Sequence, residues 1–132
     1  MNKKDLSEIV RQSWEEIRIE MIEVSRKLWS LAEIGMLERQ SSSLLADWCE
    51  SNGFEVQSAA GGLPTAFTAR YGEGKPTIGL LAEYDALPGL ANSALPRRDL
   101  VERKAGHGCG HNWIGAGTTG AAIAARAYYP RR

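Results

Sequence analysis

The sequence predicts a mixed α/β fold in which two N-terminal helices precede part of an open sheet, with a further helix packed on that sheet. Three features predict it: a long amphipathic pattern near the N-terminus, short alternating or wholly apolar runs in the middle, and a stretch rich in Gly and Ala near the C-terminus. A chain of 132 residues is long enough for one domain with a modest core. We therefore expect a single α/β unit.

The first helix is expected over residues 5–34. Apolar residues recur there at alternating spacings of four and three, as on one face of a helix, and Gly35 is a natural stop. This stripe is expected to pack on the chain's own core, although a coiled-coil partner would use the same face. A second helix is expected over residues 38–51, ended by Asn52 and Gly53. The stripe of the first helix consists of Val10, Trp14, Ile17, Met21, Val24, Leu28 and Leu31.

Strands are expected to follow the two helices. Residues 54–57 and 65–71 have the alternating pattern of half-buried strands. Residues 77–82 are apolar on both faces, as in a central strand that helices cover on each side. A polar loop is expected over residues 91–105. The last helix would begin at Asn112, and its many small residues, Gly117 and Gly120 among them, would let it approach the sheet closely.

Composition and charge exclude several classes of function. Sixteen basic and sixteen acidic residues give a net charge of zero, which argues against a general nucleic-acid-binding protein. No run of 18 apolar residues predicts a membrane span, and the charged start does not resemble a secretory signal. We expect a cytoplasmic protein in which Cys49 is a small buried side chain and forms no disulfide with Cys109.

Residues 106–112 carry the strongest chemical signal. They place His107, Cys109 and His111 within five positions, separated by glycines. A thiolate and a neutral imidazole are good ligands for zinc, manganese or cobalt, and the short spacing suits a tight loop rather than a helix face. Two other interpretations stay open: a nucleophilic Cys109 with His107 or His111 as its base, and a structural Gly-rich turn with incidental polar groups.

Two carboxylates strengthen the metal hypothesis. Glu83 and Asp85 follow the expected central strand, and ligand sites in open α/β sheets form beyond the carboxyl ends of strands. The helix that opens at Asn112 could bring His111 to the same edge. Carboxylates beside a metal-bound histidine commonly act as ligands or orient the ring. The alternative is a capped turn before Pro88.

Residues 81–89 and 106–112, in this order, resemble the metal-dependent amidohydrolases of the aminoacylase and indoleacetyl-amino-acid hydrolase type. Within that family the resemblance is greatest to the branch that acts on aminobenzoyl-glutamate. Residues 28–35 and 62–67 also fit the family, and the resemblance runs from about residue 28 to residue 129. The two motifs together are a strong signal.

The resemblance implies a zinc-peptidase-like α/β catalytic domain with an inserted smaller domain, and amide hydrolysis by metal-bound water. Cys109 and His111 would be metal ligands, His107 would support them from outside the ligand set, and Asp85 would orient the site. Glu83 stands where the wider family places a histidine ligand, so it is a candidate further ligand. The metal would be zinc or manganese, with two ions in the complete enzyme.

The resemblance also implies that the chain is incomplete. The family's general-base glutamate, its adjacent glutamate ligand and its later histidine ligands would lie beyond residue 132. Residues 1–132 are therefore expected to be the N-terminal part of the catalytic domain, inactive alone, without the inserted dimerisation domain and the C-terminal catalytic half. The substrate would be an N-acyl or aminobenzoyl amino acid, and the complete enzyme a homo-oligomer. The alternative is a non-catalytic metal-binding or interaction module.

Overall fold

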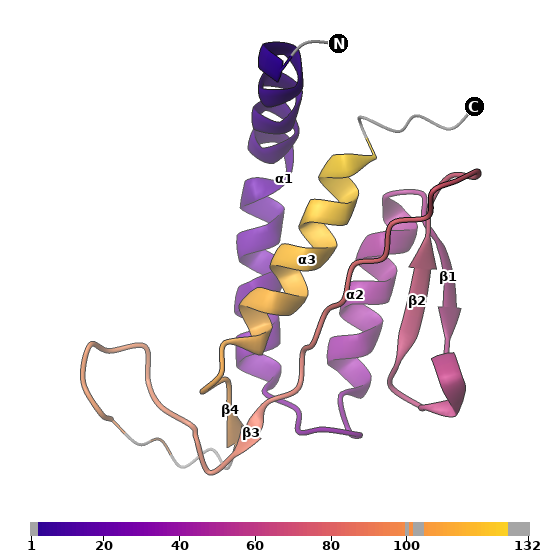
Figure 1. Ribbon diagram of the computed structural model, residues 1–132. Coiled ribbons are helices and arrows are strands. Elements are labelled where there is room, and N and C mark those ends of the chain that lie inside the picture. Colours follow the sequence, from indigo (N-terminus) through magenta and orange to yellow (C-terminus); the bar gives the residue numbers. More distant parts are fainter. Residues whose placement is uncertain (1–2, 100, 102–104, 127–132) are drawn as a thin grey trace.

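The computed structural model describes residues 3–99, 101 and 105–126. In this part of the chain, three helices stand side by side and the strands form two separate antiparallel pairs (Figure 1). The predicted mixed α/β class is thus confirmed. The helices are α1 (Lys3–Leu31), α2 (Arg39–Ser51) and α3 (His111–Ala125), and the strands are β1 (Glu55–Ser58), β2 (Phe67–Arg70), β3 (Leu87–Pro88) and β4 (Ala105–Gly106), with a short 3-10 turn, η1 (Ala60–Gly62), between β1 and β2.

The hydrophobic core lies where the three helices meet. Its buried side chains come from the middle of α1, from α2 and from the inner face of α3, and Phe54, Phe67 and Tyr84 pack against them. Helix α3 therefore rests on the other two helices, and its first residue is held in a fixed position. The buried core residues are Ile17, Met21, Val24, Leu28, Leu45, Trp48, Ala116 and Ile123.

Helix α1 confirms the first predicted helix but differs from it at both ends. It stops at Leu31, because Ala32 adopts a left-handed backbone with φ of 43°. At the other end, Val10 is 60% and Trp14 44% exposed. The expectation that the whole stripe packs on the chain's own core is therefore wrong for its first turns, which extend past α2 and α3.

A carboxylate from outside the helix caps the start of α2. Glu33 accepts hydrogen bonds from the backbone amides of Gln40 (3.1 Å) and Ser41 (2.7 Å), and from the Ser41 hydroxyl (2.7 Å). Partial burial raises the pKa of the Glu33 carboxyl, but the hydrogen bonds from Ser41 and Gln40 outweigh it and hold this pKa below its ordinary value. At its other end α2 stops as predicted, at Asn52 and Gly53.

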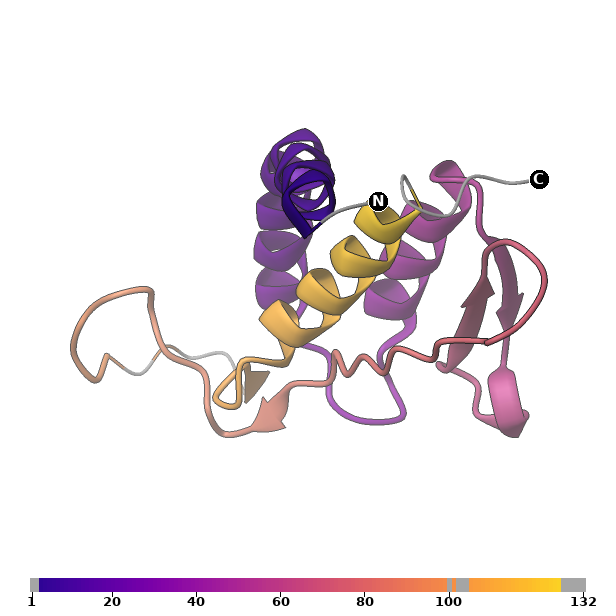
Figure 2. The ribbon, with the colours of Figure 1, turned by 45° about the horizontal axis from the view of Figure 1, so that its top comes forward.

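The β1–β2 hairpin confirms two predicted strands, but the predicted central strand over residues 77–82 is wrong. Glu55 pairs with Arg70 and Ser58 with Phe67, so the hairpin closes on itself. Residues 77–82 are in no strand, because a strand needs a neighbour for its backbone groups and no described segment pairs with them. They run as an open segment with α1, α2 and α3 on the same side (Figure 2).

Helix α3 packs against helices rather than against a sheet, which corrects the sequence-based expectation. A Cβ atom at Gly120 would lie 3.2 Å from Sδ of Met21 and 3.3 Å from Cδ1 of Ile17, both on α1. At Gly117 a Cβ atom would meet nothing within 4 Å, so this residue faces open space. The small residues of α3 are used for a close helix–helix contact, because the segment expected to form the underlying strand is unpaired.

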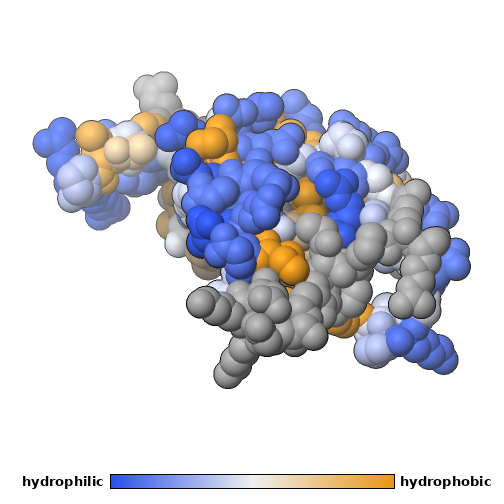
Figure 3. Space-filling view, turned by 90° about the horizontal axis from the view of Figure 1, so that it is seen from above, coloured by the Kyte–Doolittle hydropathy of each residue, from blue (hydrophilic) through white to orange (hydrophobic). Residues whose placement is uncertain are grey.

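One face of the molecule shows how polar and apolar residues are distributed over the surface. The face that looks down on the helix ends is mostly hydrophilic, with hydrophobic residues in small separate groups (Figure 3). No helix within the described residues is long and apolar enough to cross a membrane. Cys49 is buried and Cys109 exposed, and neither forms a disulfide. Parts of the polar loop (residues 100 and 102–104) and of the matched region (residues 127–129) lie outside the described residues.

Candidate functional site

Two tight turns shape the Gly-rich loop that leads into α3. The amide of Gly108 donates to the carbonyl of Gly106 at 3.0 Å, and the amide of Gly110 donates to the carbonyl of His107 at 3.1 Å. Gly110 precedes the helix with φ of 77°, a left-handed conformation that glycine adopts without strain. The turns leave Cys109 exposed and place His111 as the first residue of α3.

His111 lies between two carboxylates. Its Nδ1 is 2.7 Å from Oδ1 of Asp85, and its Nε2 is 3.2 Å from Oε2 of Glu83. The imidazole is largely enclosed, with 18% of the side chain exposed, whereas Glu83 is 64% exposed. The structure thus brings together three of the five residues that the sequence singled out.

The backbone around Glu83 and Asp85 is fixed from two sides. The amide of Ala86 donates to the carbonyl of Glu33 at 2.7 Å, and Ala86 also forms a parallel bridge with Ile34. On the other side, a Cβ atom at Gly115 would lie 3.1 Å from the carbonyl oxygen of Glu83, so α3 approaches this segment closely. The two carboxylates therefore meet His111 without a strand beneath them.

The contacts of the ring restrict its protonation state. An ionised carboxylate only accepts hydrogen bonds, so the short contact with Asp85 requires a proton on Nδ1 of His111. In the neutral ring, Nε2 is then an acceptor that faces the carboxylate of Glu83. Two acceptors at this separation repel each other unless a cation lies between them. That cation can be a proton, which makes the ring an imidazolium, or a metal ion.

The spacing of the two groups suits a shared metal ion. Nitrogen and oxygen ligands of a tetrahedral zinc lie about 3.3–3.6 Å apart, given zinc–ligand distances near 2.0–2.2 Å. The observed separation between His111 Nε2 and Glu83 Oε2 is 3.2 Å. No group of three or more His, Cys, Asp and Glu side chains that could hold a metal ion is found in the described part of the chain. His111 and Glu83 therefore fit two ligand positions of a metal ion, and Asp85 fits the place of a carboxylate that orients the histidine ring.

The other two predicted residues lie apart from this contact. His107 places Nε2 3.0 Å from the carbonyl oxygen of Leu28, which ties the loop to the end of α1. Cys109 is exposed at the turn two residues before His111. Its role as a ligand, and that of His107 as a support, stay predictions.

Two residues that help to position the site had no predicted role. Asn112 is buried at the start of α3 and donates to Oγ of Ser25 at 3.0 Å, which fixes this end of the helix on α1. The backbone carbonyl of Glu33 accepts a hydrogen bond from the amide of Ala86, and the Glu33 side chain accepts one from the amide of Ser41 in α2. Ser25 directly follows Val24 of the apolar stripe, and a polar residue there is the signal that could have indicated a buried partner.

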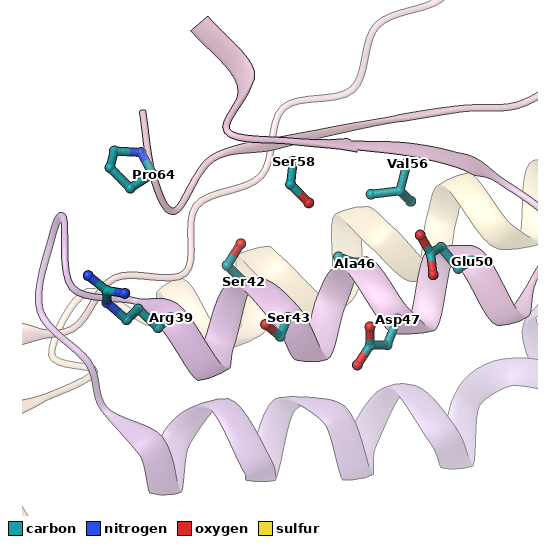
Figure 4. A pocket seen from close by; sticks show the side chains of 9 residues that line it. All are labelled: Arg39, Ser42, Ser43, Ala46, Asp47, Glu50, Val56, Ser58 and Pro64. Atoms are coloured by element: carbon teal, nitrogen blue, oxygen red, sulfur yellow. The ribbon is translucent and has the colours of Figure 1, made fainter. Parts of the chain in front are cut away.

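Two shallow pockets accompany the fold, and one of them borders the candidate site. The pocket in Figure 4 measures about 250 Å³ and lies between α2 and the segment around β1, away from His111. The other measures about 210 Å³ and is lined by Trp29, Leu90, Asn92, Ser93, Ala94, Gly106, His107 and Gly108. Its wall includes the loop that presents Cys109, and among the described residues its lining carries no carboxylate, lysine or arginine.

Comparison with known proteins gives several matches in sequence. The chain is 41% identical over 106 residues to one of the subunits of p-aminobenzoyl-glutamate hydrolase from Escherichia coli (strain K12). It is 34% identical to thermostable carboxypeptidase 1 of Saccharolobus solfataricus over 110 residues, and 30% identical to the amidohydrolase YhaA of Bacillus subtilis (strain 168) over 93 residues. No protein-family model matches the chain.

These relatives carry the names of hydrolases. The three matches cover 79%, 82% and 70% of this chain, but only 22%, 28% and 23% of the respective relatives. The chain is therefore related in sequence to the family of amidohydrolases and peptidases, and it spans about a quarter of the length of the curated relatives that it matches.

Proposed function

We propose that this chain forms one part of the active site of a metal-dependent amide hydrolase. The single observation that carries the proposal is the position of His111, with Nδ1 on Asp85 and Nε2 facing Glu83. A carboxylate that orients a histidine ring towards a metal is a common arrangement in metalloenzymes. The names of the relatives supply the reaction class, because they describe hydrolases of amide bonds.

The roles of the residues follow from this arrangement. His111 binds the metal through Nε2, and Asp85 holds the proton on Nδ1 so that Nε2 stays available. Cys109 and Glu83 provide further ligands, and His107 fixes the loop through its contact with Leu28. A zinc or manganese ion held by these residues would supply Lewis acidity for an amide carbonyl and for a water molecule. With two ions in the complete enzyme, ligands beyond the described residues would complete the site.

We propose an N-acyl or aminobenzoyl amino acid as the substrate, with aminobenzoyl-glutamate as the leading example. The E. coli relative is named for this compound. The pocket beside Gly108 suits the acyl side of such a substrate, because Trp29 and Leu90 give it apolar surface and its described lining includes no carboxylate, lysine or arginine. The name of that relative also describes one component of a larger enzyme, so we propose that the complete enzyme is oligomeric.

One observation favours a second function, a non-catalytic metal-binding or interaction module. The described residues offer no group of three ligands, whereas catalytic zinc sites normally use three protein ligands and one open position. A module of this kind would bind metal weakly and hydrolyse nothing.

A chimera separates the two functions. The chain would replace the matching 106-residue stretch of the E. coli hydrolase, and hydrolysis of p-aminobenzoyl-glutamate would be measured with added manganese or zinc. We expect hydrolysis by the chimera, its loss in the His111→Ala variant, and its retention in Asp47→Asn, an exposed control on α2. The 132-residue chain alone should be slower than an ordinary enzyme by at least about 10²–10⁴-fold, because its described residues offer no group of three metal ligands. A folded chimera with activity that is indifferent to His111→Ala would refute the proposed site.

A further inference from the structure

We propose that Tyr84 is a positioning residue of the candidate site, because its hydroxyl anchors the backbone that presents Glu83 and Asp85 to His111. This role rests on the function proposed above, in which His111 binds a metal ion. Tyr84 stands between the two carboxylates in the sequence. A residue bonded to both of their backbones can set the position of each.

The side chain of Tyr84 reaches a different part of the fold from those of its neighbours. Glu83 and Asp85 contact the two nitrogens of His111, at the start of α3. The Tyr84 hydroxyl instead donates to the backbone carbonyl of Thr65, in the turn before β2. Figure 1 shows the segment between β2 and β3 passing from the hairpin towards the first turn of α3. Tyr84 therefore ties the segment that carries the two carboxylates to the hairpin.

The carbonyl that Tyr84 uses is itself held in place by a buried carboxylate. Thr65 is 7% exposed, and its hydroxyl donates to Oε2 of Glu38 at 2.6 Å. Glu38 is 8% exposed and directly precedes α2, where its carbonyl accepts from the amide of Ser42 at 2.9 Å. Buried polar groups are costly to leave unpaired, so these contacts favour one arrangement. The anchor of Tyr84 is thus fixed on α2.

The ring of Tyr84 has little room to move away from this anchor. It lies against Phe67 of β2, with ring centroids 6.2 Å apart and planes inclined by 26°. On the side of α3, a Cβ atom at Gly115 would lie 3.3 Å from Cβ of Tyr84 and 3.1 Å from the carbonyl oxygen of Glu83. A shift of Tyr84 therefore displaces the backbone on which the two carboxylates stand.

The segment is also anchored on the other side of Asp85. The amide of Ala86 donates to the carbonyl of Glu33, and Ala86 forms a bridge with Ile34. Tyr84 and Ala86 thus hold Asp85 from both sides, one through a side chain and the other through its backbone. Loss of the Tyr84 hydroxyl removes one of these two anchors. Asp85 should then leave Nδ1 of His111 in part of the molecules, so that the ring also adopts the form with the proton on Nε2.

Removal of a single hydroxyl tests this role with little change in packing. Tyr84→Phe keeps an aromatic ring against Phe67 and removes the donor to Thr65. Tyr71→Phe is the matched control, because it also removes a phenol hydroxyl from a ring that lies against a phenylalanine, Phe54. Circular dichroism and denaturant unfolding of each variant report whether it is folded.

Nitrogen NMR of the metal-free chain, at a pH that keeps its two histidine rings neutral, measures the ring form directly. In Tyr84→Phe the signals of His111 should shift towards the form with the proton on Nε2, whereas Tyr71→Phe should leave them unchanged. His107, which contacts the carbonyl of Leu28, is an internal reference in each variant. A folded Tyr84→Phe chain with the His111 signals of the wild type would overturn the proposal.

Zinc affinity, measured by competition with a chelator, tests the effect on metal binding. Tyr84→Phe should weaken zinc binding by about tenfold, at the lower end of the loss that follows removal of groups supporting a metal ligand. In a Glu83→Gln, Asp85→Asn background the same substitution should change the affinity little, because Tyr84 acts through the position of these carboxylates. An equal loss in both backgrounds would mean a general effect on the fold and would overturn the proposal. A wild-type chain that binds no zinc would contradict the proposed function, and the NMR result would still decide the role of Tyr84.

Discussion

His111 is held at both nitrogens of its ring, and this determines what the site can bind. Asp85 fixes the proton on Nδ1, and Nε2 faces Glu83 at 3.2 Å. A ring in this state is ready to give its lone pair to a metal ion without first rearranging. In the proposed metal site, the carboxylate of Asp85 would also make the ring a stronger donor to a metal ion.

Replacing Asp85 by Asn should weaken metal binding by about 10–100-fold, as loss of an orienting carboxylate commonly does. The amide NH₂ of Asn can donate to Nδ1 and so favour the ring form with the proton on Nε2. In that form Nε2 has no free lone pair and cannot bind a metal. Zinc affinity would be measured by competition with a chelator, and the ring protonation by nitrogen NMR. Asp47→Asn, exposed on α2, is the control. Unchanged affinity and ring protonation in Asp85→Asn would contradict the assigned role.

The position of α3 depends on a close contact with α1. Gly120 allows this approach, because any side chain there would meet Met21 and Ile17 at 3.2–3.3 Å. Asn112 fixes the start of the same helix through Ser25. Since His111 is the first residue of α3, these two contacts also position the candidate site.

Gly120→Leu should reduce the free energy of unfolding by about 1–3 kcal/mol, because the added atoms overpack the contact with α1. Gly117→Leu is the matched control on the same helix, and its Cβ atom has open space. It should leave stability unchanged or raise it by up to about 1 kcal/mol through better helix propensity. Denaturant unfolding measures both. Equal effects of the two substitutions would show that α3 does not pack on α1 through Gly120.

Glu33→Gln should lower the free energy of unfolding by about 0.5–2 kcal/mol at neutral pH, as loss of a helix cap does. The Glu33 pKa is lowered in the folded chain, so its stabilisation is present above the unfolded pKa and is lost as pH falls through the folded pKa. The difference from wild type should therefore shrink in acid. Glu20→Gln, exposed on α1, is the control. A difference that does not vary with pH would contradict the role of the charge.

At the scale of the whole molecule, local sequence patterns predicted the helices better than they predicted how the elements pack together. The amphipathic period of α1 and the ends of α2 could be read from residues close together in the chain. The segment 77–82 could not, because its pattern predicts a strand while the formation of a strand depends on a partner elsewhere. The meeting of His111 with Asp85 was anticipated from a sheet edge, yet the structure achieves it by packing α3 against α1. The contact of Glu33 with Ala86 and that of Asn112 with Ser25 join residues far apart in the sequence, and no local pattern indicates them.

Cobalt(II) tests most directly whether Cys109 and His111 bind one divalent metal ion, as we propose. A thiolate bound to cobalt gives a charge-transfer absorption, so titration reports both binding and the ligand type. We predict this absorption in the wild-type chain, its loss in Cys109→Ala, and at least tenfold weaker binding in His111→Ala. Cys49→Ala is the matched control and should keep the absorption, because Cys49 is buried and burial raises its thiol pKa to about 11. The absence of the absorption in the wild-type chain, or its persistence in Cys109→Ala, would contradict the account.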